Sequence, residues 1–375
     1  MSAYIHIPFC LKRCFYCVFP VHVIGQTEIN QNYYQNILEK QYVEYLIKDI
    51  KNHYKGETLK TLYFGGGTPS LLSIESLQLI LKCFRISQST EITIEADPKT
   101  FNENKLKQLK SMGFNRLSVG IQSLQDDTLK KLNRSHLRKD IDNALQIIEK
   151  VYGSFDNCSF DFLYNLPQEV EQRSLDDLKY FIETFEPGHI SAYSLSIEEE
   201  SYFYKKLNYR EGLHPLPSND VQTCNYTKVH QILNQYDHYE ISNFAKSEKH
   251  ISQHNKNYWL GNSNFYGFGM GATSLQDLIR ITRPQTLKKY YNFVDSGQGS
   301  LIEDESCEFE KQRILLMSRL RTKWGIDKNL LSEQLIEAMK KFQEYFIFNN
   351  DNIKLKIPEG YLVCDEIVGY LQNIK

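Results

Sequence analysis

The sequence predicts an α/β fold: a partial (β/α)6 barrel followed by a small C-terminal winged-helix-like α+β domain. Between residues 4 and 195, strand-like segments alternate regularly with helix-like segments, which is typical of a parallel sheet with right-handed crossovers. Glycine or polar residues lie at or near the ends of six strands, and a barrel would bring these ends together on one face. The alternation alone also fits a doubly wound sheet, so it is the strand ends that favour the barrel.

The barrel strands are expected in short apolar runs, and the helices in the longer segments between them. The expected strands are residues 4–9, 61–64, 91–95, 116–120, 159–163 and 189–195. The expected helices are residues 28–51, 72–84, 102–112, 126–132, 139–151 and 174–185. In the first helix Tyr33, Ile37, Leu46 and Ile50 belong to an approximate apolar stripe, and Gly113 is placed to end the third helix with a left-handed cap.

The second half of the chain is less regular. Residues 202–237 are predicted to be helical with loops around Pro215 and Pro217, and an aromatic, asparagine- and glycine-rich run follows at residues 254–274. Gly297 and Gly299 mark a domain boundary within residues 287–303, which divides the chain into residues 1–285 and 300–375. The second domain is predicted to contain helices at 309–321, 328–342 and 361–371 and a hairpin with strands at 345–348 and 353–357.

Composition excludes several classes of function. The chain has 375 residues, with 44 Lys and Arg against 46 Asp and Glu, a net charge of −2. No global positive field therefore predicts a nucleic-acid partner. No apolar run approaches the ~18 residues of a transmembrane segment, and the first residues lack the basic and apolar regions of a secretory signal. We expect a cytoplasmic protein whose thiols stay reduced.

Cys10, Cys14 and Cys17 place three thiols within eight residues, directly after the first strand. They cannot all pair as disulfides, and a structural zinc site would require a fourth Cys or His ligand nearby. Buried thiols without chemistry are a further alternative, although cysteine chemistry usually decides where thiols cluster. An iron–sulfur cubane held by three thiolates would leave one iron open to another ligand. We favour this last interpretation.

Other strand ends carry groups that could contact a cofactor. Residues 65–69, Gly-Gly-Gly-Thr-Pro, follow the second strand, and glycines are needed where the backbone approaches a ligand closely or adopts positive φ. Glu95 could accept hydrogen bonds from ribose hydroxyls, Gln122 has both donors and acceptors, and Arg134 offers a planar fork suited to a carboxylate. Each alone is more often a solvated surface group, but together they indicate a cofactor site.

The C-x3-C-x2-C spacing, with Tyr16 before the last cysteine, resembles the signature of the radical S-adenosylmethionine (SAM) superfamily. This resemblance implies that the three cysteines hold a [4Fe–4S] cluster whose open iron is chelated by SAM. Residues 4–10, 63–70, 94–98, 116–123 and 161–167 and the C-terminal domain are similar to the family of oxygen-independent coproporphyrinogen III dehydrogenase. The similarity covers nearly the whole chain and implies SAM contacts from Tyr4, Gly66, Gly67, Thr68, Glu95, Gln122, Arg134, Asp161, Ser194 and Thr273.

Two branches of this family differ near the cysteine loop. The dehydrogenase branch has a further cysteine where this chain has Phe19, and an N-terminal extension for which the nine residues before Cys10 leave no room. Both departures favour the haem-chaperone branch of the family. That branch has an H-N-x-x-Y-W segment, and this chain is similar to it from His254 to Trp259. Imidazole is a common haem ligand, and aromatic side chains can cover a porphyrin face. The resemblance therefore implies His254 as the haem ligand.

The resulting hypothesis is a chaperone that binds haem and delivers it to an acceptor, by resemblance a membrane-bound respiratory protein, with peripheral membrane association during delivery. A low-potential donor such as flavodoxin or ferredoxin would reduce the cluster. One alternative is oxidative decarboxylation of coproporphyrinogen III to protoporphyrinogen IX by a 5′-deoxyadenosyl radical, and another is radical chemistry on an unrelated substrate. The sequence leaves open whether SAM is cleaved. DNA binding by the C-terminal domain is disfavoured because no continuous basic face is visible.

Overall fold

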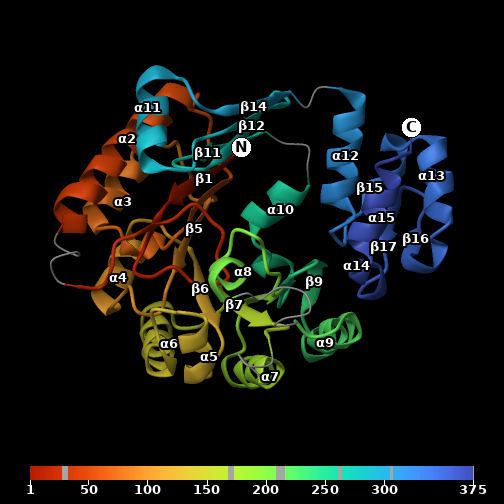
Figure 1. Ribbon diagram of the computed structural model, residues 1–375, viewed down its shortest axis with the longest axis horizontal. Coiled ribbons are helices and arrows are strands. Elements are labelled where there is room, and N and C mark those ends of the chain that lie inside the picture. The colour runs from red at the N-terminus through yellow and green to blue at the C-terminus, as the bar shows by residue number, and fades with distance from the viewer. Residues whose placement is uncertain (28–32, 168–172, 208–215, 261–263, 305–306, 375) are drawn as a thin grey trace.

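Figure 1 shows the computed structural model, which describes the chain except residues 28–32, 168–172, 208–215, 261–263, 305–306 and 375. Its central element is a twelve-stranded sheet in the order β14-β13-β12-β11-β1-β4-β5-β6-β7-β8-β10-β9. Helices α2 to α7 lie around the outside of this sheet, and a small unit formed by the C-terminal residues lies to one side of it (Figure 1).

The middle of the sheet is formed by six parallel strands. They are β1 (Ser2–Ile7), β4 (Thr61–Gly66), β5 (Glu91–Ala96), β6 (Arg116–Gln122), β7 (Cys158–Tyr164) and β8 (His189–Ser194). Each pairs in parallel with the next in this order. Nearly every residue of β4 to β7 is buried, as expected for parallel strands covered on both faces. The six predicted strands are therefore confirmed.

Helices follow the barrel strands as predicted. They are α2 (Glu39–His53), α3 (Ile74–Leu81), α4 (Glu103–Ser111), α5 (Asp126–Lys131), α6 (Arg138–Tyr152) and α7 (Ser174–Phe185). Ser73 and Asn102 cap α3 and α4 by accepting hydrogen bonds from backbone N–H groups three residues later. Gly113 adopts φ +98 just after α4, which confirms the predicted left-handed cap.

The buried face of the first helix differs from the predicted stripe. Residues 28–32 of that prediction lie outside the described residues, and residues 34–38 form a π-helical turn before α2. Such a turn changes the phase of a helix relative to the regular 3.6-residue repeat. Tyr33 and Ile37 are consequently 51% and 49% exposed, whereas Tyr34 is buried with Leu46 and Ile50.

Further strands extend the sheet on both sides of the barrel run. On one side β11 (Phe265–Phe268) is parallel to β1, and β12 (Thr273–Gln276), β13 (Ile279–Thr282) and β14 (Leu301–Asp304) continue antiparallel. On the other side β10 (Asn243–Ala245) and β9 (Asp237–Glu240) are antiparallel to β8 and to each other. Helices α8 (Tyr202–Leu207), α9 (Asn219–Ile232) and α10 (Gln253–Trp259) lie in the connections.

The predicted domain boundary contains regular structure instead of a linker. Residues 287–296 form α11 (Leu287–Ser296), whose Asp295 accepts hydrogen bonds from Tyr45 and Lys48 of α2 at 3.1 and 2.5 Å. Strand β14 follows and pairs with β13 of the large sheet. Residues 287–304 therefore belong with the first unit, and we propose that the division follows β14.

The C-terminal unit has the predicted helices and hairpin. Its elements are α12 (Glu308–Arg319), β15 (Ile326–Asp327), α13 (Glu333–Lys340), β16 (Phe346–Phe348), β17 (Asn352–Leu355), α14 (Glu359–Leu362) and α15 (Cys364–Leu371). The two-residue strand β15 was not predicted, and it completes a three-stranded sheet in the order β15-β17-β16.

The C-terminal unit contacts α10 and β9 through charged and aromatic side chains. Lys323 pairs with Asp237 of β9, and the Arg321 guanidinium lies 5.8 Å from the ring centroid of Trp259. Lys256 of α10 lies 4.8 Å from the ring centroid of Trp324. These contacts fix α10 between the two units. Within the described part of the chain, every helix is too short or too polar to cross a bilayer.

Candidate functional site

The three cysteines of the loop lie around one cavity at the carboxyl ends of the barrel strands. Cys10 ends the short strand β2 (Phe9–Cys10), which pairs in parallel with β3 (His22–Val23) and so closes the loop at its base. Cys10, Cys14 and Cys17 all line the cavity, whose volume is about 510 Å³. The structure thus brings together the three thiols that the sequence singled out.

Phe15, between the first two loop thiols and the third, anchors the loop to the barrel. Its backbone N–H donates to the Leu132 carbonyl at 3.1 Å, and its carbonyl accepts from the Phe203 N–H at 2.9 Å. Its ring stacks on Tyr202 with the centroids 4.4 Å apart. Because α8 supplies Tyr202 and Phe203 and Leu132 directly follows α5, the loop is held from outside the cysteine segment as well as from within it.

The surroundings of the thiols fit an iron–sulfur cluster. The Thr68 hydroxyl lies 3.7 Å from Cys10 Sγ, and Arg134 Nη1 donates to Cys14 Sγ at 3.3 Å. Burial raises the pKa of Cys10 to about 12 and raises the pKa of Cys17, so these groups would be neutral thiols unless a cation such as iron deprotonates them. Among the described residues, no three His, Cys, Asp or Glu side chains are placed to hold one metal ion.

Asp97, at the end of β5, organises the side of the cavity next to Cys14. Its Oδ2 accepts hydrogen bonds from Arg134 Nη2 at 3.2 Å, Ser135 Oγ at 2.7 Å and His136 Nδ1 at 3.0 Å. Burial alone would raise the pKa of Asp97, but its hydrogen bond with His136 and the charge of Arg134 hold that pKa well below its usual range. Arg134 Nη2 also donates to the Gly120 carbonyl at 2.9 Å, so the guanidinium is fixed in place.

The glycine segment after β4 is crowded by protein atoms. At Gly66, where φ is +113, a Cβ would lie 2.5 Å from the His6 ring, and at Gly67 it would lie 2.7 Å from the Phe9 carbonyl oxygen. The Gly66 N–H donates to Glu95 Oε2 at 3.0 Å. The packing of β1 against β4 therefore requires glycine here whether or not a ligand is bound. Ligand contact by these glycines, which line the cavity, stays a prediction.

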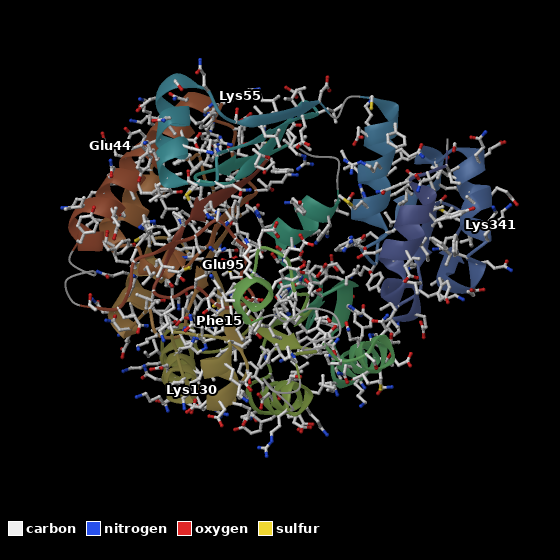
Figure 2. All side chains as sticks on the ribbon, viewed as in Figure 1. Phe15, Glu44, Lys55, Glu95, Lys130 and Lys341 are labelled. Atoms are coloured by element: carbon white, nitrogen blue, oxygen red, sulfur yellow. The ribbon has the colours of Figure 1, made fainter. Side chains whose placement is uncertain are left out.

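Two carboxylates lie deeper in the barrel, where the charged form is disfavoured. Figure 2 shows Glu95 near the middle of the molecule, while Lys130 and Lys341 extend from its rim. Burial raises the pKa of Glu95 to about 7, although Tyr63 donates a hydrogen bond to its Oε1 at 2.9 Å. Burial likewise raises the pKa of Asp161 to about 6. Both carboxylates can therefore change charge near neutral pH.

The interior of the barrel is polar where barrel interiors usually hold branched apolar side chains. A second cavity of about 270 Å³ shares Glu95 and Asp161 with the cluster cavity and is otherwise lined mainly by polar or aromatic groups. Two of these, Thr93 Oγ1 and Arg116 Nη2, are buried and find no hydrogen-bond partner among the described residues. The chamber extends to Tyr4 and His254 at its far side.

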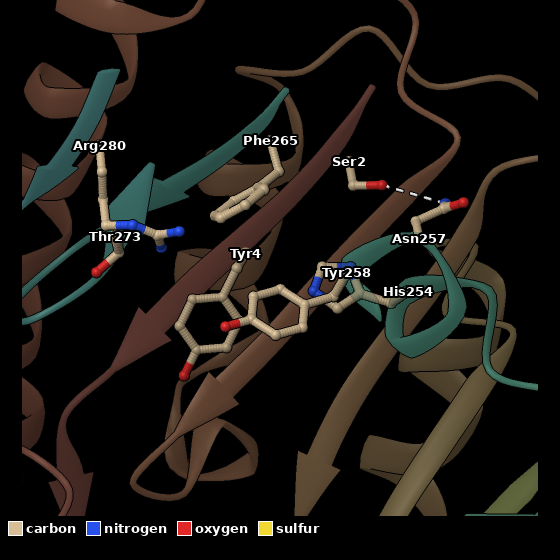
Figure 3. A pocket seen from close by; sticks show the side chains of 8 residues that line it. All are labelled: Ser2, Tyr4, His254, Asn257, Tyr258, Phe265, Thr273 and Arg280. Carbon is tan, nitrogen blue, oxygen red and sulfur yellow. Dashed lines mark hydrogen bonds between the residues drawn. The ribbon is translucent and has the colours of Figure 1, made fainter. Parts of the chain in front are cut away.

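His254 lies in a third cavity, at the amino ends of the strands (Figure 3). This cavity has a volume of about 280 Å³ and is lined by Ser2, Tyr4, His254, Asn257, Tyr258, Phe265, Thr273 and Arg280. His254 Nδ1 lies 2.9 Å from Thr61 Oγ1, and the backbone N–H of His254 donates to Glu91 Oε1 at 3.0 Å. Thr61 and Glu91 are the first residues of β4 and β5. His254 and the cysteines therefore lie at opposite ends of the barrel.

Comparison with known proteins decides between the branches considered above. A model of the radical SAM superfamily matches residues 4–181. The protein named heme chaperone HemW from Synechocystis sp. is 38% identical over 335 residues, which cover 87% of this chain and 79% of that protein. Its namesake from Bacillus subtilis is 33% identical over 388 residues, covering 98% of both chains.

The chain belongs to the HemW family of radical SAM proteins.

Membership of the HemW family confirms the branch predicted from Phe19 and from the segment at residues 254–259. A solved structure described as coproporphyrinogen III oxidase (HemN) from Escherichia coli, a radical SAM enzyme, matches with a TM-score of 0.80 at 21% identity, covering 99% of this chain and 90% of that one. At this level of identity the match supports the fold alone. It confirms that the HemW family member described here has the predicted radical SAM α/β fold.

Most of the residues predicted to contact SAM lie together in this HemW family chain. The cluster cavity is lined by Gly66, Gly67, Thr68, Glu95, Gln122, Arg134, Asp161 and Ser194. Tyr4 and Thr273 instead line the His254 cavity, where the Tyr4 hydroxyl is 3.1 Å from His6 Nδ1 and the Thr273 hydroxyl 2.9 Å from that of Thr282. Thr273 is separated from the barrel strand ends because β12 belongs to the antiparallel flank of the sheet.

Two residues that line these cavities, Asp97 and Arg280, were not predicted as site residues. Asp97 lies within the segment at residues 94–98 that resembles the family, but no role was predicted for it, although the Arg-Ser-His run at residues 134–136 could have suggested a buried anion as its partner. Arg280 was not considered, because nothing in the sequence places β13 beside α10. Both positions become visible only when the strand order is known.

Proposed function

We propose that this protein is a haem chaperone, which binds haem at His254, holds a [4Fe–4S] cluster and SAM at the other end of the barrel, and hands haem to an acceptor protein. Relatives named heme chaperone HemW that match over most of their length support this function. The observation that carries the proposal is that His254 is a buried imidazole with a lowered pKa in a cavity lined partly by aromatic side chains.

His254 has the form that a haem ligand needs. Burial lowers its pKa to about 4, so the imidazole is neutral at physiological pH. His254 Nδ1 lies 2.9 Å from the Thr61 hydroxyl. In the tautomer in which Nδ1 donates to that hydroxyl, Nε2 has a lone pair for iron, and the hydrogen bond orients the ring. The ring stacks on Tyr63 with the centroids 4.8 Å apart. Tyr258 and Phe265 add aromatic surface against which a porphyrin face can pack.

In this proposal Cys10, Cys14 and Cys17 hold the cluster. When bound, the cluster would supply an open iron that SAM can chelate, and it would pass on an electron from a low-potential donor. Arg134, held by Asp97, places positive charge beside Cys14. Glu95 and Asp161 offer carboxylate oxygens to hydroxyl groups of a ligand in the same cavity. The acceptor, predicted as a membrane-bound respiratory protein, and the flavodoxin- or ferredoxin-type donor remain predictions.

Haem titration of the full chain under anaerobic conditions tests this function. The cluster is reconstituted, haem is added stepwise, and the Soret band is followed in the wild type and in His254→Ala. His53→Ala is the matched control, because the His53 side chain is 37% exposed and lies on α2. We expect His254→Ala to lose the ligand-specific Soret shift and at least tenfold in affinity, and His53→Ala to titrate like the wild type.

The same preparations distinguish the chaperone from the alternative enzyme. They are incubated with coproporphyrinogen III, SAM and a reductant, and the porphyrins are separated by chromatography. We expect no protoporphyrinogen IX. Its formation at a catalytic rate would contradict the proposed function, and so would haem binding that is unchanged in His254→Ala.

A further inference from the structure

The side chain of Tyr63 contacts residues of both proposed sites. Its hydroxyl donates to Glu95 Oε1 at 2.9 Å, and Glu95 lines the cluster cavity. Its ring stacks on the His254 imidazole, with the centroids 4.8 Å apart and the planes inclined by 28°, and His254 lines the cavity proposed for haem. Tyr63 itself lines the chamber between these two cavities. One side chain therefore joins the Glu95 carboxylate to the proposed haem ligand.

The surroundings of Tyr63 leave its ring little room to move. At Gly65, which has no side chain, an added Cβ would lie 2.9 Å from both Tyr63 Cε1 and Glu95 Oε1. The Tyr4 ring packs against the same point, with Cε2 at 2.8 Å, and its centroid lies 6.1 Å from that of Tyr63. In an interior packed this closely, a shift of one group displaces its neighbours. The position of Glu95 is therefore passed through Tyr63 to the ring of His254.

Glu95 can accept hydrogen bonds from a ligand without releasing Tyr63. An ionised carboxylate has about four lone-pair sites on its two oxygens. The Tyr63 hydroxyl uses one site on Oε1, and the Gly66 N–H uses one on Oε2. The remaining sites can accept the hydroxyl groups of SAM in the cluster cavity. Such a ligand would fix the carboxylate and, with it, the acceptor of the Tyr63 hydroxyl.

Resting on the proposed function, we propose that Tyr63 couples the two sites, so that SAM bound at Glu95 tightens the binding of haem at His254. A ligating ring that is already held in place loses less conformational freedom when haem binds, which gives positive coupling without a large structural change. Coupling free energies are reciprocal, so haem tightens SAM binding by the same factor. Tyr63 is thus a positioning residue that acts on haem through His254. A chaperone built in this way releases haem more readily once SAM has left.

Haem titration with and without saturating SAM tests this coupling. The cluster-reconstituted chain is kept free of reductant, so that SAM is not cleaved, and at pH 8, where Glu95 with its pKa of about 7 is mostly ionised. Dissociation constants are measured from the Soret band in the wild type, Tyr63→Phe and Tyr45→Phe. Tyr63→Phe keeps the ring that stacks on His254 and removes the hydroxyl that contacts Glu95.

Tyr45 is the matched control. It also donates to a carboxylate, that of Asp295 at 3.1 Å, and its ring also stacks on another, that of Tyr291 with the centroids 4.2 Å apart. Tyr45 lies on α2 and is not among the residues that line the three cavities. Tyr45→Phe therefore removes the same kind of hydrogen bond without touching either proposed site.

We expect SAM to lower the haem dissociation constant about fivefold or more in the wild type and in Tyr45→Phe, at the lower end of typical couplings. In Tyr63→Phe, SAM should change this constant by less than about twofold, and its value without SAM should stay within about threefold of the wild type, because the stacked ring remains. Equilibrium dialysis should show that haem tightens SAM binding by the same factor in the wild type.

Coupling that survives in Tyr63→Phe, or is lost equally in Tyr45→Phe, would refute the role of Tyr63 while leaving the proposed function intact. So would a wild type in which His254 ligates haem but SAM leaves the haem affinity unchanged or lowers it, and this result needs no variant of Tyr63 to fold. A wild type that binds no haem, or binds it unchanged after His254→Ala, would overturn the proposed function and this inference with it.

Discussion

Replacing Asp97 by Asn should both destabilise the fold and weaken the cluster site. The change keeps the side-chain shape and removes the charge that faces Arg134, in a pair whose side chains are only 12% and 10% exposed. Removing one partner of a buried ion pair leaves the other charge uncompensated and typically costs about 3 to 5 kcal/mol. Ser135 and His136 would also lose a charged acceptor. We therefore expect the free energy of unfolding to fall by about 3 to 5 kcal/mol.

Urea denaturation of the cluster-free protein, followed by circular dichroism, measures this change. Asp142→Asn is the matched control, because Asp142 pairs with Arg138 at the surface, where the side chains are 47% and 33% exposed. Such an exposed pair is worth about 0.5 kcal/mol. Because Arg134 also contacts Cys14, iron content after reconstitution should fall in Asp97→Asn and not in the control. A loss below about 1 kcal/mol with normal iron content would refute the reasoning, since a buried pair should cost more.

Three further predictions concern single residues. Haem affinity should stay nearly constant between pH 7.5 and 5, because the pKa of His254 is lowered to about 4. A histidine ligand with the ordinary pKa would lose about thirtyfold in haem affinity by pH 5. Haem binding that falls with a midpoint near pH 6.5, followed by the Soret band, would contradict this prediction. SAM affinity, measured by equilibrium dialysis, should rise from pH 6 to 8 as Glu95, whose pKa is about 7, ionises. In Glu95→Gln it should rise by no more than about twofold, from the remaining ionisation of Asp161, whose pKa is about 6. Gly56→Ala should lower the free energy of unfolding by ~1–2 kcal/mol through backbone strain alone. Gly66→Ala should lower it by more, because of these two positions only Gly66 would place the new Cβ against a ring, at 2.5 Å. Equal urea midpoints for the two variants would contradict this prediction.

The barrel and its cluster cavity could be predicted from the sequence because each depends on local patterns. Strand and helix segments alternate, and in parallel units the strand ends meet on one face, so Glu95, Asp161 and the cysteines could be assigned to one site without coordinates. The flanks of the sheet could not be predicted in this way. Strands β9 to β14 are three or four residues long, and their pairing depends on distant segments such as β1 with β11.

Two of the residues predicted to contact SAM, Tyr4 and Thr273, do not line the cluster cavity. Tyr4 lies on the first barrel strand as predicted, and its side chain lines the chamber and the His254 cavity. Thr273 lies on a flank whose position only the pairing of β11 with β12 determines. The first helix was misjudged for a local reason, because a π-helical turn at residues 34–38 has no clear signature in the apolar spacing.

The central claim is that haem and cluster occupy separate sites at opposite ends of one barrel. Haem and iron–sulfur content, measured on the same samples of His254→Ala and of the triple variant Cys10→Ala/Cys14→Ala/Cys17→Ala, test this claim most directly. We expect His254→Ala to retain the cluster and lose haem, and the triple variant to lose the cluster and retain haem at wild-type affinity. Loss of both groups in either folded variant would contradict the separation of the two sites.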